Sequence, residues 1–579
     1  MKMPIALTFL LLAVSAAAQA PRNVSRPSAQ TIREWQSRKF GMFIHWGLYS
    51  IPGGVWNGKK ITNGYSEQIM SHAPIPKGEY EKLAAQFNPT KWDPEAVVAL
   101  AKAAGMRFIV ITSKHHDGFA MFQTKTTNYN VVDATPYHKD VVKQLSEACA
   151  RNGIKFGVYY STIDWHHPDA TPWTDDNNNP IPPKHADLNV AQLQELTTRY
   201  GPLTELWFDM GKPTPDQSKR FADTVHTNQS QCMVSGRVFN HQGDFTVMGD
   251  NALPEFVIDE PWQTPASIYD ETWGYRSWQD RSDLNGKINE HIEKLVKVVS
   301  RGGNYLLNIG PEGDGSIVEF EADVLNGVGK WLSTNGEAIY GGQPQPFRTL
   351  DFGYATVKPR RLYLLVEKWP ADGLLRLPGL KTPIRKAYLL ADTAKAPLGI
   401  ENDVPAIRVT KKVETPPVTV VAVELDTNAS VIPPLVRPDA AGKITLTAAE
   451  ADVYYNYNGY GYYEPPTIYK KQWHFEVPSP GHYRVDVIYK DAPAAVRAEF
   501  DVDGRHVIGD FGASSGEHTV NIAVLQLVPR PYSTLTITPP HPFPKGTKLG
   551  MNIENVVLTR EAGKESPAPF VRQPLRGSR

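Results

Sequence analysis

Short apolar runs alternate with amphipathic stretches from about residue 33 to residue 331, and this alternation constrains the fold more than any other feature. The apolar runs have the length of buried strands, and the clearest are FIVIT at 108–112, FGVYY at 156–160, LWF at 206–208 and YLLNI at 305–309. The intervening stretches have the period of a helix and cover 94–104, 140–152, 190–200, 217–228 and 286–299. Strands that alternate with helices in this way predict βαβ units and a parallel sheet.

The length of this alternating region favours one α/β architecture. About 310 residues suit a TIM-like (β/α) barrel, which takes roughly 200 to more than 400 residues. An open, doubly wound sheet is the structural alternative, but no glycine-rich phosphate-binding sequence follows the first strand. We therefore predict a (β/α)-barrel catalytic domain over residues 21–344.

The sequence changes character after about Pro344, where short alternating or β-branched runs are separated by Pro, Gly and Asp. Such runs predict a β-sandwich over 345–432 and a second β-rich accessory domain over 433–562, followed by a tail at 563–579. The predicted strands lie at 362–368, 384–390, 407–413, 418–425, 473–477, 483–489, 495–502 and 534–538. The tract YYNYNGYGYY at 454–463 is either an exposed platform for sugars or a strand edge that packs on the barrel.

The N-terminus has the features of a signal peptide. Lys2 precedes an apolar run at 5–14, and Ala18 and Ala20 form an A-x-A cleavage site, so we expect removal of residues 1–20. A membrane anchor is the alternative, but the run is too short to span a bilayer and no later segment is long enough. We therefore expect an exported protein, periplasmic or extracellular, without a membrane span.

Charge and cysteine content exclude several classes of partner. Lys and Arg number 61 and Asp and Glu number 61, so no net positive charge favours nucleic acid as a partner. The two cysteines, Cys149 and Cys232, match no metal-binding or CxxC spacing. One disulfide is compatible with this count, but we expect two buried free thiols.

Polar and titratable residues gather where the predicted strands end. The segments KFGMFIHWG (39–47), KHHDGF (114–119) and LWFDMG (206–211) contain three histidines, two tryptophans and two acids. Imidazoles donate and accept hydrogen bonds at neutral pH and suit sugar hydroxyls, and a carboxylate among aromatic rings suits a nucleophile. The alternatives are core histidines, a zinc site at the histidine pair, or an N-cap role for Asp209. Zinc is disfavoured because neither HExxH nor a cysteine accompanies the pair.

These segments, with GVYYS, WGY and SRGGNYLLNIGP, resemble the family 29 glycoside hydrolases, the α-L-fucosidases. The resemblance extends in order from Arg33 to about Gly341. It implies a barrel-like catalytic domain, a C-terminal β-sandwich, no metal cofactor, a fucosylated glycan as substrate, and hydrolysis with retention of configuration.

The resemblance also assigns roles to single residues. Asp209 matches the nucleophile, and the residues that match sugar-binding positions are His45, Glu67, His115, His116, Trp207, Arg237, Trp273 and either Tyr159 or Tyr160. Many relatives have Trp after the acid that matches Glu67, whereas this chain has Gln68.

The acid/base residue varies in position among relatives, and Asp250 in GDFTVMGDN is the best candidate. Glu260 and Glu255 are the alternatives. Relatives often have a Trp-Glu pair where this chain has Trp262 and Gln263, so that position provides no proton donor here.

Two other functions remain open at this point. One is a carbohydrate-binding protein without turnover, which an intact LWFDMG segment disfavours. The other is a retaining glycosidase for a different sugar, because an apolar slot for the C5 methyl group of fucose discriminates only about 10²-fold against an added hydroxyl.

Overall fold

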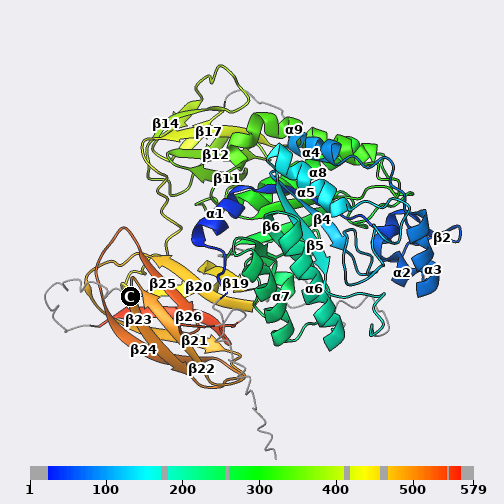
Figure 1. Cartoon of the computed structure of the whole chain (residues 1–579). Helices are drawn as coiled ribbons and strands as arrows, with labels where there is room; N and C mark the ends of the chain where they lie inside the picture. The colour runs from blue at the N-terminus through cyan, green and yellow to red at the C-terminus, as the bar shows by residue number, and fades with distance from the viewer. Residues whose placement is uncertain are drawn as a thin grey trace, which may run out of the picture.

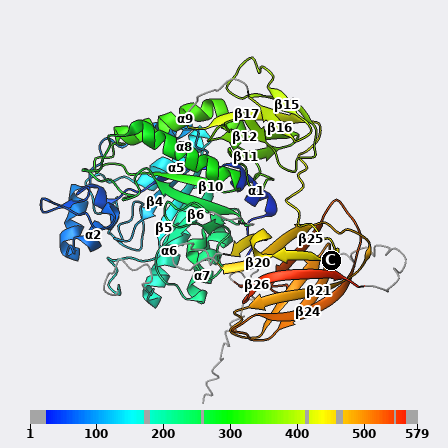
Figure 2. The ribbon, with the colours of Figure 1, turned by 180° about the vertical axis from the view of Figure 1, so that it is seen from behind.

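A computed structural model of the chain describes residues 24–170, 180–254, 258, 260–409, 417–456, 467–543 and 547–561. Figures 1 and 2 show a helix-rich part formed by the first 340 residues or so and β-rich parts formed by the rest. The predicted signal peptide, Glu255, most of the 454–463 tract and the tail lie outside the described residues.

An eight-stranded sheet occupies the centre of the helix-rich part, and its neighbouring strands all pair in parallel. In sheet order the strands are β7 (Met233–Val234), β6 (Leu203–Asp209), β5 (Lys155–Ser161), β4 (Phe108–Lys114), β1 (Phe40–Ile44), β10 (Asn304–Ile309), β9 (Trp262–Ser267) and β8 (Thr246–Val247). The sheet is curled, because a parallel bridge between Ser235 and Phe245 joins the ends of the two edge strands. Because the strands are parallel, the carboxyl ends of all eight lie at the same edge of the sheet.

The strands form because their side chains are apolar on both faces. β4 has the sequence FIVITSK, and all seven of its residues are buried. β-branched and aromatic residues fit a pleated strand, and burial on both faces is typical of a parallel sheet covered by helices.

The long helices lie around the outside of the curled sheet (Figure 1). They are α1 (Ala29–Ser37), α4 (Pro94–Ala103), α5 (Val141–Asn152), α6 (Pro183–Arg199), α7 (Pro215–Asn228), α8 (Leu284–Ser300) and α9 (Glu319–Ile339). Side-chain caps fix where several of them begin: Asp93 caps α4, Asp140 caps α5, and Thr214 forms a capping box with Gln217 at α7. Each cap satisfies backbone N–H groups that have no partner within the first turn.

Short elements make up the connections in this part of the chain. They are η1 (Leu48–Ser50), β2 (Val55–Trp56), β3 (Lys59–Lys60), η2 (Ser66–Gln68), α2 (Ile69–His72), α3 (Lys77–Tyr80), η3 (Glu81–Gln86) and η4 (Gly236–Val238).

The inner face of the curled sheet has its own hydrophobic core. It is formed by Trp35, Phe43, Phe108, Val110, Tyr159, Trp207, Met233, Phe245, Val247, Trp273 and Leu306. Side chains alternate between the two faces of a strand, so Trp207 of β6 belongs to this inner core while its neighbours Leu206 and Phe208 belong to the outer one.

The described residues of the β-rich parts form four antiparallel sheets. After α9, one sheet has the order β11-β12-β17-β14 and a second has the order β13-β16-β15. Their bounds are β11 (Gly353–Lys358), β12 (Arg361–Val366), β13 (Leu374–Arg376), β14 (Ile384–Leu389), β15 (Gly399–Glu401), β16 (Ala406–Arg408) and β17 (Thr419–Leu425). Both sheets contribute side chains to one core, which includes Leu364, Leu375 and Ile407.

The last two sheets share another core, which includes Trp473, Val485 and Phe500. Their orders are β18-β26-β21-β24 and β19-β20-β25-β22-β23. The bounds are β18 (Ile444–Thr447), η5 (Ala448–Glu450), β19 (Asp452–Asn456), β20 (Thr467–Phe475), β21 (Gly481–Lys490), β22 (Val496–Val502), β23 (Arg505–Phe511), β24 (His518–Leu527), β25 (Ser533–Thr538) and β26 (Asn552–Arg560).

The predicted strands and helices are all present, although α6 begins seven residues earlier than the 190 expected from the pattern and part of 407–413 is outside the described residues. Sequence reasoning missed β7, β8 and β9. The first two have two residues each, and β9 carries Gln263 and Pro265 in place of an apolar run. Cys149 and Cys232 are buried free thiols, as expected. Among the described residues, no helix has both the length and the apolar character needed to cross a bilayer.

Candidate active site

The carboxyl ends of the strands bring the predicted site residues together. His45 follows β1, His115 and His116 follow β4, and Arg237 lies in η4 directly after β7. Tyr159 lies on β5, Trp207 and Asp209 lie on β6, Asp250 follows β8, and Trp273 follows β9. The C-terminal face of such a sheet is where parallel α/β enzymes place their active sites.

Arg237 joins two carboxylates at the centre of this face. Its Nη1 donates to Asp209 Oδ1 at 2.9 Å and its Nη2 donates to Asp250 Oδ1 at 2.6 Å. The arginine side chain is 3% exposed, whereas the side chains of Asp209 and Asp250 are 13% and 24% exposed. A single buried cation thus bonds to both carboxyl groups, and both of these side chains remain partly exposed.

Asp209 is ionised because its partners outweigh its burial. Burial opposes the charge, but Arg237, His116 and the Tyr159 hydroxyl together hold the pKa of Asp209 below its usual value. The Tyr159 hydroxyl donates to Asp209 Oδ2 at 2.7 Å, and His116 Nε2 lies 3.8 Å from the same oxygen. An ionised carboxylate whose oxygens are oriented by two donors is prepared to act as a nucleophile.

The three histidines are neutral at physiological pH. Burial lowers the pKa of His45 and of His116 to about 4, and burial with the two neighbouring imidazoles lowers the pKa of His115 well below its usual value. His45 Nδ1 lies 2.7 Å from Asn308 Oδ1, and His116 Nδ1 lies 2.8 Å from the Ser161 hydroxyl. A neutral imidazole has one donor and one acceptor nitrogen, which suits the recognition of hydroxyl groups.

Aromatic rings surround the carboxylates. Phe43 contacts Trp207 with ring centroids 5.1 Å apart and Trp273 at 6.1 Å, and Tyr159 stacks on Trp207 at 5.7 Å. Such rings offer apolar faces next to the polar groups of His45 and Asp209. This combination fits a sugar, which has apolar C–H faces and polar hydroxyls.

Glu67 fixes the segment that carries Trp273. Its Oε2 accepts hydrogen bonds from the backbone N–H groups of Trp273 at 3.1 Å and Gly274 at 2.8 Å. Burial raises the pKa of Glu67 to about 7, and these backbone donors oppose the rise. The neighbouring Gln68 side chain lies 3.2 Å from His72 Nε2 and so contacts its own short helix.

The backbone directly after Asp209 adopts an unusual conformation. Met210 has φ of 60° and Gly211 has φ of 83°, so the chain turns through the left-handed region at both residues. A non-glycine residue there costs of order 1–3 kcal/mol and persists only where its surroundings impose it. Thr162 supplies that constraint, because its N–H donates to Asp209 O at 2.8 Å and its hydroxyl donates to Met210 O.

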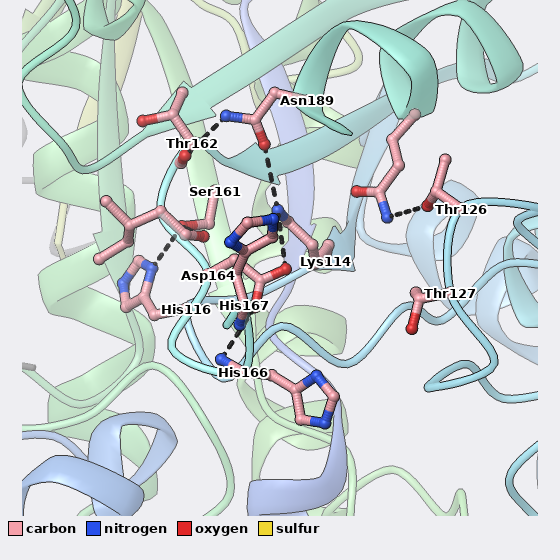
Figure 3. A network of polar contacts seen from close by, with 12 residues as sticks. Lys114, His116, Thr126, Thr127, Ser161, Thr162, Asp164, His166, His167 and Asn189 are labelled. Carbon is pink, nitrogen blue, oxygen red and sulfur yellow. Dashed lines mark hydrogen bonds and ion pairs between the residues drawn. The ribbon is translucent and has the colours of Figure 1, made fainter. Parts of the chain in front are cut away.

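A buried polar network supports the loop that follows β5 (Figure 3). Lys114 Nζ lies 3.7 Å from Asp164 Oδ2 and 3.4 Å from Asn189 Oδ1, and the lysine side chain is wholly buried. Asn189 in turn donates to Thr162 O at 2.8 Å. Trp165 N–H donates to His116 O at 2.7 Å, so the same loop holds the backbone of a site histidine.

The residues that the sequence offered as alternatives lie in different surroundings. The Tyr159 hydroxyl donates to Asp209, whereas the Tyr160 hydroxyl lies 2.8 Å from Asn189 Oδ1 and 2.7 Å from Gln192 Oε1. Asp250 shares Arg237 with Asp209, whereas Glu260 Oε1 accepts from the Thr246 hydroxyl. Glu255 lies outside the described residues.

Sequence reasoning missed Asn308 and Phe43 as members of the site. Asn308 is the polar residue of the otherwise apolar run YLLNI, and that exception was a usable signal. Phe43 gave none, because it is one apolar residue in an apolar strand. Within the described part of the chain, no three His, Cys, Asp or Glu side chains form a group that fits a metal ion.

A carboxylate pair at the carboxyl edge of a parallel sheet, among neutral histidines and aromatic rings, defines this protein as a glycoside hydrolase. The family model for α-L-fucosidase matches residues 10–337. The chain therefore belongs to the α-L-fucosidase family, family 29 of the glycoside hydrolases.

Curated relatives and solved structures agree with this assignment. Tissue α-L-fucosidase of Rattus norvegicus is 33% identical over 400 residues, which are 64% of this chain and 85% of the relative. That of Homo sapiens is 32% identical over 429 residues, which are 69% and 89%.

Among solved structures, an α-L-fucosidase from Vibrio sp. strain EJY3 has a TM-score of 0.63 at 26% identity and covers 93% of this chain and 99% of its own. A Bacteroides thetaiotaomicron enzyme, solved as a trapped covalent intermediate in complex with 2-fluoro-fucosyl fluoride, has a TM-score of 0.62 at 27% identity and covers 70% and 98%.

The bridge formed by Arg237 predicts a shifted pH profile for Arg237→Met. Without the cation, burial dominates and raises the pKa of Asp209, so the nucleophile is protonated over more of the acid range. The loss of an adjacent opposite charge moves a carboxylate by about 1–3 pH units. The acid limb of kcat/KM should therefore move up by at least about one pH unit, measured on an aryl α-L-fucoside from pH 3 to 8. Arg237→Lys keeps the charge and should shift less, and an unchanged acid limb in Arg237→Met contradicts this account.

The network in Figure 3 predicts a pH-dependent loss of stability for Asp164→Asn. The variant keeps the acceptor oxygen but leaves Lys114 buried without its counter-charge, which costs about 3–5 kcal/mol. Burial already lowers the pKa of Lys114 to about 8, and the variant lowers it further, so folding releases the proton at a lower pH. The loss in free energy of unfolding should therefore be larger at pH 6 than at pH 8.5, measured by urea titration. An equal loss at both values would show that the lysine charge does not matter.

Proposed function

We propose that this enzyme hydrolyses terminal α-L-fucosyl residues from glycans by double displacement, with Asp209 as nucleophile and Asp250 as acid/base. One observation carries the assignment of the pair: a single guanidinium group, that of Arg237, donates to both carboxylates. Retaining glycosidases need their two carboxyl groups about 5–5.5 Å apart, and a bridge through neighbouring nitrogens of one guanidinium favours such a short separation.

In the first step Asp209 attacks C1 of the fucosyl residue. The bond from C1 to the glycosidic oxygen breaks while Asp250 transfers its proton to that oxygen, and a fucosyl ester of Asp209 forms. Tyr159 and Arg237 orient the attacking carboxylate through their hydrogen bonds to its two oxygens.

In the second step Asp250 takes a proton from water, and the resulting oxygen nucleophile attacks C1. The ester bond breaks and Asp209 leaves as a carboxylate, which Arg237 and the Tyr159 hydroxyl again stabilise. Two displacements at C1 retain its configuration.

The side chains around the pair support fucose as the sugar. Fucose lacks a hydroxyl on C6, and the rings of Trp207 and Trp273, which pack around Phe43, offer an apolar surface for its methyl group. The neutral imidazoles of His45 and His115 and the carboxyl group of Glu67 supply polar contacts for ring hydroxyls.

The proposed architecture is a closed (β/α) barrel over 21–344, a β-sandwich over 345–432 and a further β-rich accessory domain over 433–562. The bridge between Ser235 and Phe245 supports closure of the eight-stranded sheet. The shared core of the β11-to-β17 sheets supports the first sandwich, and that of the β18-to-β26 sheets supports the second unit.

Substitution of the two carboxylates tests the mechanism. Asp209→Gly should lose activity by on the order of 10⁴-fold or more, whereas Asp250→Ala should lose about 10²–10⁴-fold on natural glycans and less on aryl fucosides with good leaving groups. Azide should restore turnover of Asp250→Ala, because it replaces the water that needs a base.

Glu260→Gln is the matched control and should keep normal turnover. Labelling with 2-fluoro-fucosyl fluoride followed by peptide mass spectrometry should place the adduct on Asp209. An adduct elsewhere, or an Asp250→Ala enzyme with normal activity on natural glycans, overturns the assignment, and a panel of nitrophenyl glycosides reports the sugar preference.

We propose that the enzyme is exported to the periplasm or beyond after cleavage following Ala20. Lys2, the apolar run at 5–14 and the Ala18-x-Ala20 site support this proposal. Expression of the full chain in a Gram-negative host should yield mature protein whose N-terminus is Pro21, measured by fractionation and N-terminal sequencing. Retention of Met1 on protein confined to the cytoplasm would refute it.

A further inference from the structure

Two carboxyl groups and an indole ring follow one another along the inner face of β6. Glu205, Trp207 and Asp209 share that face because side chains alternate along a strand. Asp209 is the proposed nucleophile, but Glu205 is completely buried beneath Trp207 and takes no part in the chemistry described above. A buried carboxyl group without a catalytic role calls for an explanation, since its desolvation is costly.

A chain of hydrogen bonds connects Glu205 to Trp207 across the inner core. Trp35 Nε1 donates to Glu205 Oε2 at 2.6 Å, and Gln263 Nε2 donates to Glu205 Oε1 at 3.1 Å. Trp207 Nε1 then donates to Gln263 Oε1 at 2.9 Å. The direction of the chain is fixed, because an indole only donates and a carboxylate only accepts, so the amide of Gln263 has one possible orientation.

Trp207 in turn contacts both groups that hold the nucleophile. The guanidinium of Arg237 lies 4.7 Å from the centroid of the indole ring, and the ring of Tyr159 stacks on it at 5.7 Å with an interplanar angle of 18°. Arg237 and Tyr159 donate to opposite oxygens of Asp209. A rotation of the indole would therefore displace both donors of Asp209 together.

We infer that Glu205 and Gln263 are positioning residues for the reaction: they fix the plane of Trp207, against which Arg237 and Tyr159 pack, and so fix Asp209 for attack on C1. The inference rests on the proposed role of Asp209. It gives a reason for the amide at position 263, since an amide offers an acceptor to Trp207 and a donor to Glu205 at any pH, whereas a carboxyl group does so only while protonated.

The ionisable groups around Glu205 make the hydrogen-bond chain from Trp35 to Trp207 sensitive to substitution. Burial raises the pKa of Glu205 to about 7, against the donors Trp35 and Gln263 and the charge of Arg38. The buried thiol of Cys232 is a further titratable group that interacts with this carboxyl. A second carboxyl group at position 263 would form a buried pair that holds one proton at low pH and repels once both groups ionise.

Three variants separate positioning from simple packing. Gln263→Leu removes both hydrogen bonds of the amide. Gln263→Glu keeps the chain only while the pair with Glu205 shares a proton, because the protonated carboxyl then donates in place of the amide. The exchange Glu205→Gln with Gln263→Glu restores every bond: Trp35 donates to the new amide, which donates to the new carboxylate, which accepts from Trp207.

The main measurement is the rate at which 2-fluoro-fucosyl fluoride labels Asp209, because this step needs the nucleophile but not the second-step base. Gln263→Leu should label about 10²-fold more slowly, since small displacements of reacting groups cost that much. Gln263→Glu should label within about threefold of wild type at pH 6 and at least about tenfold more slowly than wild type at pH 8.5. The exchange variant should label within about threefold of wild type at both values. Thermal melts of each variant at both pH values give the folded fraction.

Two results overturn the inference. One is a Gln263→Leu enzyme that is folded and labels at the wild-type rate. The other is an exchange variant that labels as slowly at pH 8.5 as Gln263→Glu does. Failure of the wild-type enzyme to label at Asp209 is a separate result, because it rejects the proposed nucleophile rather than its support.

Discussion

The bond pair from Arg237 to Asp209 and Asp250 is the interaction on which the rest of the site depends. Two carboxyl groups share one donor here, and burial opposes the charge of Asp209. A guanidinium resolves both problems at once, because its planar fork presents parallel donors and stays charged at any relevant pH. Its own burial against Trp207 keeps it from turning into solvent. The proposed chemistry thus depends on a cation that takes no proton and forms no covalent bond.

Three layers of side chains, which differ in polarity, support Arg237. The upper layer is polar, where neutral histidines and Tyr159 face the carboxylates. The middle layer is aromatic and packs Phe43, Trp207 and Tyr159 together. The lowest layer returns to polar groups with Glu205 and Gln263, enclosed by Trp35. Outside the sheet, the network around Lys114 and Asp164 holds the loop after β5 in the same fixed manner (Figure 3). The positions of the carboxyl oxygens that Arg237 holds therefore depend on side chains throughout the interior of the curled sheet.

The sequence alone predicted the elements whose apolar residues recur with the spacing of a strand or a helix. The strand FIVIT and its neighbours, and helices with clear caps, follow from local pattern, and strand ends marked the histidines and Asp209. Roles such as that of Arg237 came from resemblance to a family, since one arginine in SGR has no distinguishing local pattern. Contacts across the sheet were beyond reach, because Gln263 and Glu205 are 58 residues apart and only the curl brings them together. The two-residue strands β7 and β8 were missed for the related reason that their position depends on pairing rather than on their own residues.

The two short strands make the main-chain support of Asp250 different from that of Asp209. Asp209 ends a seven-residue strand whose pairing with β5 extends to Asp209 itself, and whose pairing with β7 covers Glu205 and Leu206. Arg237 follows β7 and Asp250 follows β8. These two edge strands have two residues each and are joined by the bridge between Ser235 and Phe245. Segments with few backbone bonds open at lower free energy than segments within a sheet. The proposed nucleophile, which must meet C1 at one fixed distance, therefore lies on the more extensively paired strand. The proposed acid/base residue, which gives up a proton and later takes one back, follows a strand with fewer main-chain bonds.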